Sequence, residues 1–203
     1  GPEEAAQVMQ LFIGEDIPLK KLTDILDQTL AFDFPLVQIG ADKYCLELFH
    51  GPTKAFKDVG ARFMSRILGY FKAQDSNKSH VLVATSGDTG AAVANGFLNI
   101  DGVEVHILFP KGKVSEYQER QMTTLGGNIN AYEVEGTFDD CQSLVKQAFS
   151  DNGLKEKISL SSANSINVAR FLPQMLYYFI ASNTLKNKNL NNIQVCKTLL
   201  NIT

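Results

Sequence analysis

LELFHGPTKAFKDVGA, residues 46–61, is the stretch that decides the fold, because it joins a strand, a turn and a helix that carries a lysine. The apolar run at 44–49 favours a strand, and the residues HGPT at 50–53 favour a turn. A helix is predicted over 56–72. Its apolar face is formed by side chains at helical spacing: Val59, Phe63, Ile67 and Phe71.

Lys57 falls in the first turn of this predicted helix, where a lysine is electrostatically unexpected. A helix N-terminus carries partial positive charge, which favours anions and makes it easier for an amine to lose its proton where water is kept away. A neutral amine can attack an aldehyde and form a Schiff base. The alternative is a solvated surface lysine, which is the usual account of a lone lysine, and the surrounding residues argue against it.

Residues 48–64 resemble the cofactor-lysine segment of threonine synthases, which are pyridoxal-phosphate enzymes of the fold that includes tryptophan synthase β. The family's segment reads close to LFHGPT-x-AFKD-x-GARFM, and each of those letters stands here. Lys54 departs from the pattern, because relatives commonly have an apolar residue there. Lys54 and Lys57 are close enough in sequence to lie on one helical face. The resemblance assigns the Schiff base with pyridoxal 5'-phosphate to Lys57.

The composition is that of an ordinary globular protein, with 203 residues, 44% hydrophobic and 20% charged. A net charge of -3 gives no reason to expect nucleic acid or an anionic membrane as a partner. No apolar run approaches the roughly 18 residues of a membrane span. Cys45, Cys141 and Cys196 form no disulfide or metal-binding pattern, and the histidines have no metal-ligand spacing. A cytoplasmic protein without a metal site is therefore expected.

Strands and helices are predicted to alternate after the lysine helix. The first part of the chain is predicted to hold a helical stretch at 3–31 and a hairpin built from 36–39 and 44–49. The later strands are predicted at 80–84, 103–109, 129–134, 158–161 and 193–196. The later helices are predicted at 88–98, 115–124, 137–150 and 166–184.

This alternation predicts an α/β fold with mostly parallel open sheets and helices on both faces. The resemblance implies the same architecture, that of tryptophan synthase β. We expect two regions. Residues 1–75 would hold the N-terminal helices, the hairpin and the cofactor-lysine helix, and residues 76–203 would form an α/β domain with the substrate-binding turns.

Residues 85–90, TSGDTG, follow a predicted strand and open a helix. Backbone N–H groups converge at such a turn, so a carboxylate or phosphate binds there readily. The same residue types also cap helices without any ligand. Threonine synthases resemble this run as ATSGDTGAA, and in that family the turn holds substrate beside the cofactor ring. The resemblance therefore implies substrate binding by Ser86, Gly87, Asp88 and Thr89. Whether Asp88 also binds cofactor or only caps its helix stays open.

Residues 162–167, SANSIN, with Arg170 one turn later, repeat the pattern of a strand, a polar turn and a helix. Asparagine and serine in such places are usually caps, and an arginine there is more often a solvated charge. The run SANSIN-x-x-R nevertheless resembles the family's own. By that resemblance Asn164, Asn167 and Arg170 point toward the substrate.

The resemblance extends from about residue 17 to Cys196. In the family the last strand runs into a VPSGNFG-like loop that holds the cofactor phosphate, and a long carboxyl-terminal portion follows. Neither is found in 1–203, so we expect an incomplete form that binds the cofactor weakly.

The activity implied is that of a carbon–oxygen lyase, threonine synthase, which converts O-phospho-L-homoserine and water to L-threonine and phosphate by γ-elimination and β-hydration. The alternatives are a related pyridoxal-phosphate-dependent phospholyase that acts on a similar amino-acid phosphate ester, and a non-catalytic fragment. The oligomeric state stays open.

Overall fold

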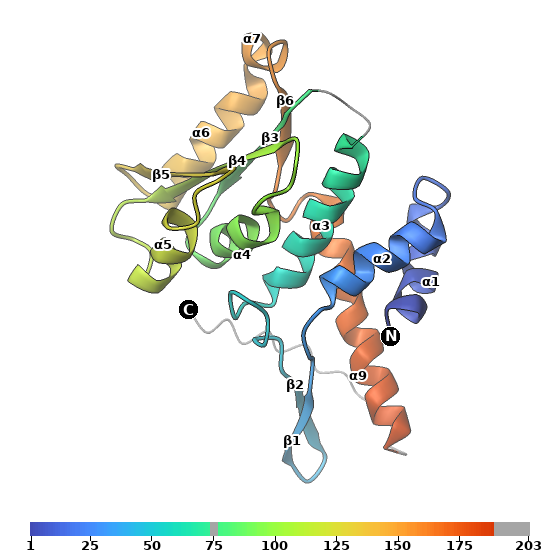
Figure 1. Cartoon of the computed structure of the whole chain (residues 1–203). Helices are drawn as coiled ribbons and strands as arrows, with labels where there is room; N and C mark the ends of the chain where they lie inside the picture. The colour runs from blue at the N-terminus through green and yellow to red at the C-terminus, as the bar shows by residue number, and fades with distance from the viewer. Residues whose placement is uncertain (74–76, 189–203) are drawn as a thin grey trace.

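The computed structural model describes residues 1–73 and 77–188. The strand predicted at 193–196, Cys196 and the expected boundary near residue 75 lie outside the described residues. Figure 1 shows a helical part that holds the N-terminus, a projecting hairpin, and an α/β layer, with one long helix leading from the hairpin toward the layer.

The helical part begins with two helices that pack against each other, α1 (Pro2–Ile13) and α2 (Leu19–Thr29). The sequence predicted helix throughout 3–31, and the structure interrupts it. Gly14 has φ 66, a left-handed conformation that ends α1, and Pro18 directly precedes α2. Their apolar faces meet in a core with the next long helix, in which the largest members are Met9, Ile17, Leu22, Leu26 and Phe63.

The predicted hairpin is present as β1 (Leu36–Gly40) and β2 (Lys43–Leu46), which pair antiparallel. After it the chain turns into α3 (Lys57–Lys72). Of the predicted apolar face of α3, Val59 and Phe63 are buried, whereas Phe71 is 45% exposed. The predicted apolar face was therefore wrong at its last position.

The main sheet confirms the predicted parallel architecture. In the described part of the chain it contains β3 (Ser79–Ala84), β4 (Val103–Pro110), β5 (Ile129–Val134) and β6 (Ser159–Ser162), in the spatial order β5-β4-β3-β6. Each neighbouring pair is parallel, with Val81 opposite Val105 and Ile107 opposite Ala131. Because β6 returns to the far side of β3, the turns that follow β3 and β6 leave neighbouring strands at the same edge.

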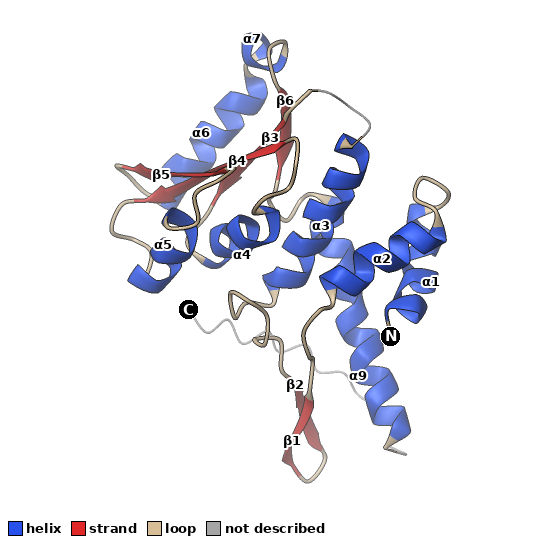
Figure 2. Ribbon diagram, viewed as in Figure 1, coloured by secondary structure: helices blue, strands red, loops and turns tan. Residues whose placement is uncertain are grey.

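Helices cover both faces of this sheet, as Figure 2 shows. One face packs against α4 (Asp88–Phe97) and α5 (Glu116–Thr123), and α3 lies against α4. The other face packs against α6 (Phe138–Ser150), and the short α7 (Asn152–Lys155) follows it. The main core therefore lies between the sheet and α4, around Val83, Phe97 and Ile107.

The helix predicted at 166–184 is wrong as a single element. The structure has α8 (Val168–Phe171), a 3₁₀ segment η1 (Leu172–Met175) and α9 (Leu176–Asn187). Pro173 lies in the 3₁₀ segment. Proline has no N–H group to donate, and its ring collides with the preceding helical turn, so one continuous α-helix is disfavoured there.

Candidate active site

Lys57 is the first residue of α3, and its amine lies beside the start of α4. The Nζ atom is 3.6 Å from Oδ2 of Asp88, and the Lys57 side chain is 26% exposed. The same amine is 5.4 Å from the ring centroid of Phe56. A ligand from solvent can therefore reach a primary amine that has a carboxylate next to it.

The turn before Lys57 is held by a buried carboxylate. Asp58, which is 1% exposed, accepts hydrogen bonds from Thr53 N at 3.0 Å and from Thr53 Oγ1 at 2.5 Å. Burial raises the pKa of the Asp58 carboxyl, and the two bonds from Thr53 oppose that shift. A Cβ atom at Gly51 would lie 2.5 Å from Asp58 Oδ2, so the turn closes tightly only around a glycine. This loop fixes the backbone that leads into Lys57.

Lys54 lies in this turn and not on α3. Its φ is 61, which is left-handed, and its amine is 6.0 Å from the ring centroid of Tyr117 on α5. The expectation that Lys54 and Lys57 share a helical face is therefore wrong, because the helix begins only at Lys57.

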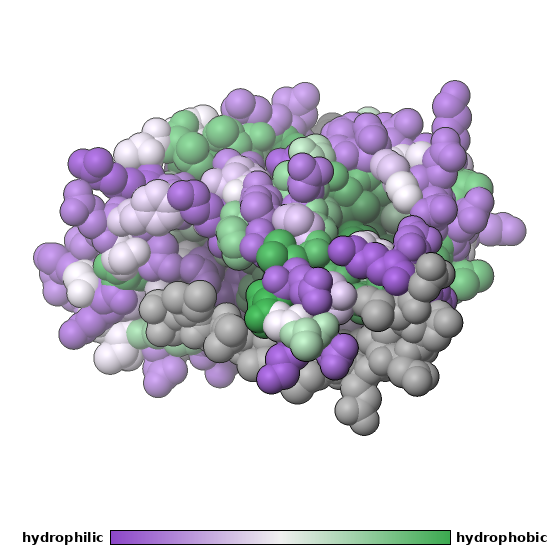
Figure 3. Space-filling view, turned by 90° about the horizontal axis from the view of Figure 1, so that it is seen from below, coloured by the Kyte–Doolittle hydropathy of each residue, from purple (hydrophilic) through white to green (hydrophobic). Residues whose placement is uncertain are grey.

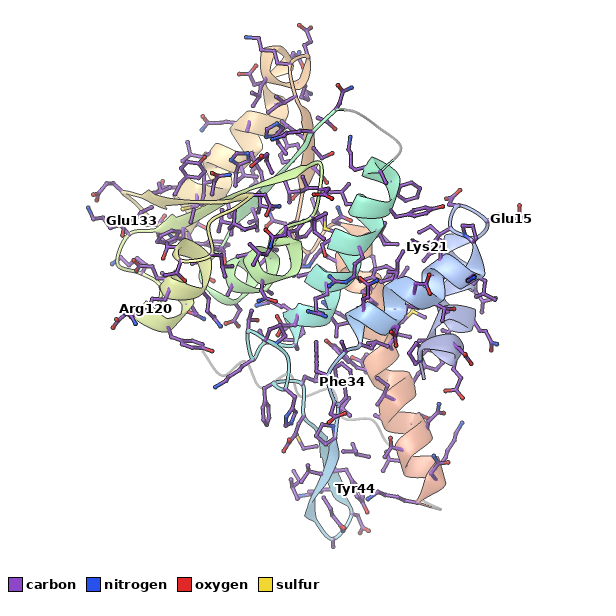
Figure 4. The ribbon with its side chains drawn as sticks, in the orientation of Figure 1. Glu15, Lys21, Phe34, Tyr44, Arg120 and Glu133 are labelled. Carbon is purple, nitrogen blue, oxygen red and sulfur yellow. The ribbon has the colours of Figure 1, made fainter. Side chains whose placement is uncertain are left out.

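Tyr177 of α9 supports the same segment from the other side. Its hydroxyl donates a 2.5 Å hydrogen bond to the carbonyl oxygen of Phe56, the residue before Lys57. Its ring lies 5.6 Å from that of Phe34, which Figure 4 labels at the entry to the hairpin. Burial raises the pKa of the Tyr177 hydroxyl. No pattern in the sequence indicated this contact, since a single tyrosine in an apolar helix resembles any other core residue.

The turn at 85–90 keeps several backbone donors free. Thr85 Oγ1 accepts hydrogen bonds from Gly87 N at 2.9 Å and from Gly90 N at 2.8 Å. Within residues 1–73 and 77–188, the amides of Ser86, Asp88 and Thr89 have no hydrogen-bond acceptor. These amides stand at the N-terminus of α4, where an anion is favoured.

Asp88 connects α3 to α5. Its Oδ2 lies near the amine of Lys57, and its Oδ1 accepts a 2.7 Å hydrogen bond from Gln118 Nε2. It makes no side-chain capping bond to α4. Of the two roles left open for Asp88, capping therefore has no support, and contact with a cofactor stays a prediction. Gln118 was not among the predicted site residues, because the spacing S-x-x-Q at 115–118 indicates only a capping box.

The turn at 162–167 uses its polar side chains on its own backbone. Asn167 accepts a hydrogen bond from Ala169 N and donates one to the carbonyl of Ser162, each 3.0 Å long. The backbone N–H group of Asn164 donates a 3.2 Å hydrogen bond to Ser162 Oγ. No hydrogen bond or ion pair within the described residues connects this turn to Lys57. The substrate roles of Asn164 and Asn167 stay predictions.

Arg170 is buried, with 2% of its surface exposed. Its Nη1 donates a 2.5 Å hydrogen bond to the carbonyl of Ala163, and burial lowers its pKa to about 10. Its backbone oxygen lies against α3 so closely that a Cβ atom at Gly60 would be 2.3 Å away. Arg170 therefore joins α8 to α3 and β6 in this structure, and its substrate role stays a prediction.

Two other kinds of site find no support in the part of the chain that the structure describes. No group of three or more histidine, cysteine, aspartate or glutamate side chains is placed to hold a metal ion there. None of the described helices has the length and apolar composition that crossing a bilayer requires. In Figure 3, which views the molecule from below, hydrophobic surface lies between hydrophilic residues.

Comparison with known families and relatives gives a consistent result. The model of the family described as pyridoxal-phosphate dependent enzyme matches residues 33–176. The threonine synthase of Buchnera aphidicola subsp. Baizongia pistaciae is 47% identical over 94% of this chain and 45% of its own length. The threonine synthase of Escherichia coli is 48% identical over 94% of this chain and 44% of its own length. The chain thus spans less than half the length of these relatives.

Solved structures agree with the fold. The structure of pyridoxal-phosphate-bound threonine synthase from Brucella melitensis matches with a TM-score of 0.85 and 42% identity, over 93% of this chain and 42% of that one. Yeast threonine synthase matches with a TM-score of 0.83 and 38% identity, over 92% of this chain and 40% of that one. These likenesses confirm the predicted α/β fold of the tryptophan synthase β type.

Proposed function

We propose that this chain, which belongs to the family of pyridoxal-phosphate dependent enzymes, carries the reactive lysine of a threonine synthase. The observation that carries the proposal is the Lys57 amine 3.6 Å from Asp88, beside a turn with three amides that have no acceptor among the described residues. The proposed substrates are O-phospho-L-homoserine and water, and the products are L-threonine and phosphate. The likeness to threonine synthases over 94% of the chain supports this choice within the family.

The residues present fit pyridoxal 5'-phosphate. The cofactor has an aldehyde, which requires a primary amine, and the Lys57 amine is partly exposed to solvent. When bound, this cofactor stores the electron pair left on a substrate carbon after a proton is removed. Lys57 would hold it covalently, and the Asp88 carboxylate lies 3.6 Å from the Lys57 amine.

Lys57 has a second task once the amino group of the substrate has replaced it. The freed amine is then a base within reach of the substrate, and it moves protons at the carbon that bears the amino group and at the next carbon. Asp88 keeps this amine near its position, because the carboxylate attracts the protonated form. In the net reaction a proton replaces phosphate on the γ carbon, and the hydroxyl group of water replaces one hydrogen on the β carbon.

The turn at 85–90 has a positioning task in this proposal. The amides of Ser86, Asp88 and Thr89, which have no acceptor in the part of the chain that the structure describes, are donors for the carboxylate of the substrate. A small anionic substrate suits this end of α4.

The described cysteines Cys45 and Cys141 are free thiols, which supports the proposed cytoplasmic location.

The proposal is tested on the protein at its natural length, supplied with pyridoxal phosphate and O-phospho-L-homoserine. We expect phosphate and threonine in equal amounts. Borohydride should fix the cofactor on the peptide that contains Lys57. Lys57→Ala should abolish this attachment, and the matched variant Lys54→Leu should keep it. Attachment to Lys54 alone would overturn the assignment. Phosphate without threonine would indicate a related phospholyase.

A further inference from the structure

Gln118 of α5 lies at the centre of a chain of contacts that ends at Lys57. Its Nε2 donates to Asp88 Oδ1 at 2.7 Å, and Asp88 Oδ2 lies 3.6 Å from the Lys57 amine. We propose that Gln118 is a positioning residue, which holds the Asp88 carboxylate so that it faces Lys57. This inference rests on the proposed role of Lys57 and adds a residue that acts through Asp88.

The orientation of the Gln118 amide follows from its other partner. Its Oε1 accepts hydrogen bonds from Ser115 N at 3.3 Å and from Ser115 Oγ at 2.9 Å. A backbone N–H group can only donate, so the oxygen of the amide must face Ser115. The NH₂ group therefore faces Asp88 and donates to its Oδ1 atom. The two ends of Gln118 are matched to two different partners.

The backbone of the 85–90 turn leaves space for the side chain of Gln118. Gly87 has φ 142, a conformation that L side chains rarely adopt. A Cβ atom at Gly87 would lie 2.4 Å from Gln118 Oε1 and 2.6 Å from its Nε2. The missing side chain at Gly87 thus makes space for the Gln118 amide directly beside Asp88.

A neutral side chain is well suited to this place. Gln118 holds one oxygen of Asp88 by a hydrogen bond and brings no charge of its own. No second cation therefore competes with the Lys57 amine for the carboxylate. A lysine or arginine at 118 would compete for the carboxylate, and a glutamate would repel it. The geometry therefore needs a donor that carries no charge.

A purely structural role for Gln118 is the competing explanation. Ser115 and Gln118 form the capping box of α5, in which each side chain bonds the backbone of the other residue. Two variants separate the roles. Gln118→Glu keeps an acceptor for Ser115, as capping boxes commonly have, but replaces the donor to Asp88 with a second carboxylate. Ser115→Ala breaks the capping box and leaves the donor to Asp88 in place.

The experiment measures the reactivity of Lys57 in the cofactor-free protein at its natural length. Amines are acetylated competitively with a limiting amount of acetic anhydride at pH 8, and mass spectrometry compares Lys57 with the exposed Lys155. In Gln118→Glu we expect Lys57 to react about threefold to tenfold more slowly, because an added negative charge favours the protonated amine. In Ser115→Ala we expect a rate within about twofold of the original, with an unfolding midpoint lowered by a few degrees, at most about 5 °C.

A second readout is capture of pyridoxal phosphate at Lys57, trapped with borohydride. Gln118→Glu should reduce it about tenfold, equivalent to about 1.4 kcal/mol, and Ser115→Ala should leave it unchanged.

If Gln118→Glu does not fold, Gln118→Met, which lacks the donor and adds no charge, is judged by this capture. Equal slowing in Ser115→Ala and Gln118→Glu would overturn the inference, as would unchanged capture in the Gln118 variants. Failure of the original protein to capture cofactor at Lys57 would overturn the proposed function instead.

Discussion

Two turns of this molecule are rich in small polar residues and use their side chains in different ways. The turn at 85–90 follows β3, and the turn at 162–167 follows the neighbouring strand β6. In the first, Thr85 at the end of the strand satisfies two amides, which leaves others free. In the second, Asn167 uses both ends of its side chain on the local backbone. Among the described residues the backbone amides of Ser165, Ile166 and Val168 also have no acceptor, so the two turns differ in how their side chains are used and not in whether donors are left free.

The helices that follow the two turns differ as well. The first turn opens α4, which has 10 residues, whereas the second opens α8, which has 4. The partial charge at a helix end comes from aligned peptide groups, so α4 presents a stronger field to an anion. The neighbouring Lys57 adds a cation that the second turn does not contact. A helix-opening motif therefore favours an anion most where a longer helix and a neighbouring amine add to its free donors.

The largest effect is expected where the second turn is anchored to α3. Gly60→Ala would place a Cβ atom 2.3 Å from the backbone oxygen of Arg170, and no side-chain rotation can relieve this. We expect the free energy of unfolding to fall by about 3 kcal/mol, measured by urea denaturation. Gly69→Ala is the control in the same helix, since its nearest contact would be Ile100 at 3.2 Å. Equal stability of the two variants would show that α8 is not held tightly.

The next largest effect is expected at the first turn. Asp88→Asn keeps the shape of the side chain and removes the charge beside Lys57, so we expect turnover to fall about 100-fold through misplacement of the amine. Stability should change by less than about 0.5 kcal/mol, because Asp88 is 43% exposed and exposed pairs contribute little. The control is Glu135→Gln, which breaks the exposed pair with Lys111 and should leave turnover unchanged. Normal turnover in Asp88→Asn would show that the reaction does not depend on the contact between the first turn and Lys57.

The sequence predicted those parts of the site that depend on local order. The place of Lys57 at the start of a helix and the parallel strands followed from turn residues and apolar periodicity. The bond between Gln118 and Asp88 joins residues separated by 30 positions, and the bond between Tyr177 and Phe56 joins residues separated by 121. Such contacts depend on how helices pack, which no local pattern contains. The break at Pro173 was different, because the proline itself was a usable signal.

An intermediate effect is expected from Thr85→Val. Valine has nearly the same shape, but it cannot accept the hydrogen bonds from the buried amides of Gly87 and Gly90. We expect the free energy of unfolding to fall by about 2 kcal/mol, because buried donors left without acceptors are costly. Thr85→Ser keeps the hydroxyl and should lose much less. If both variants lose the same amount, the methyl group and not the hydroxyl supports the turn.

The smallest effect is expected from Asn167→Ala in the second turn. The variant removes one cap from the short helix α8, together with the bond to the Ser162 carbonyl. We expect a loss of about 1 kcal/mol in stability, the usual cost of a cap.

If Asn167 keeps both of its backbone partners during the reaction, turnover should stay within about threefold of the original, whereas the substrate role implied by the resemblance predicts a much larger fall. Asn167→Asp is the matched variant, since an aspartate still accepts from Ala169 N and should restore much of the stability. Turnover measured on both variants at saturating substrate tests the contrast between the turns. A 100-fold fall in turnover with unchanged stability would mean that Asn167 leaves its backbone partners to contact substrate, and the two turns would then serve the same purpose.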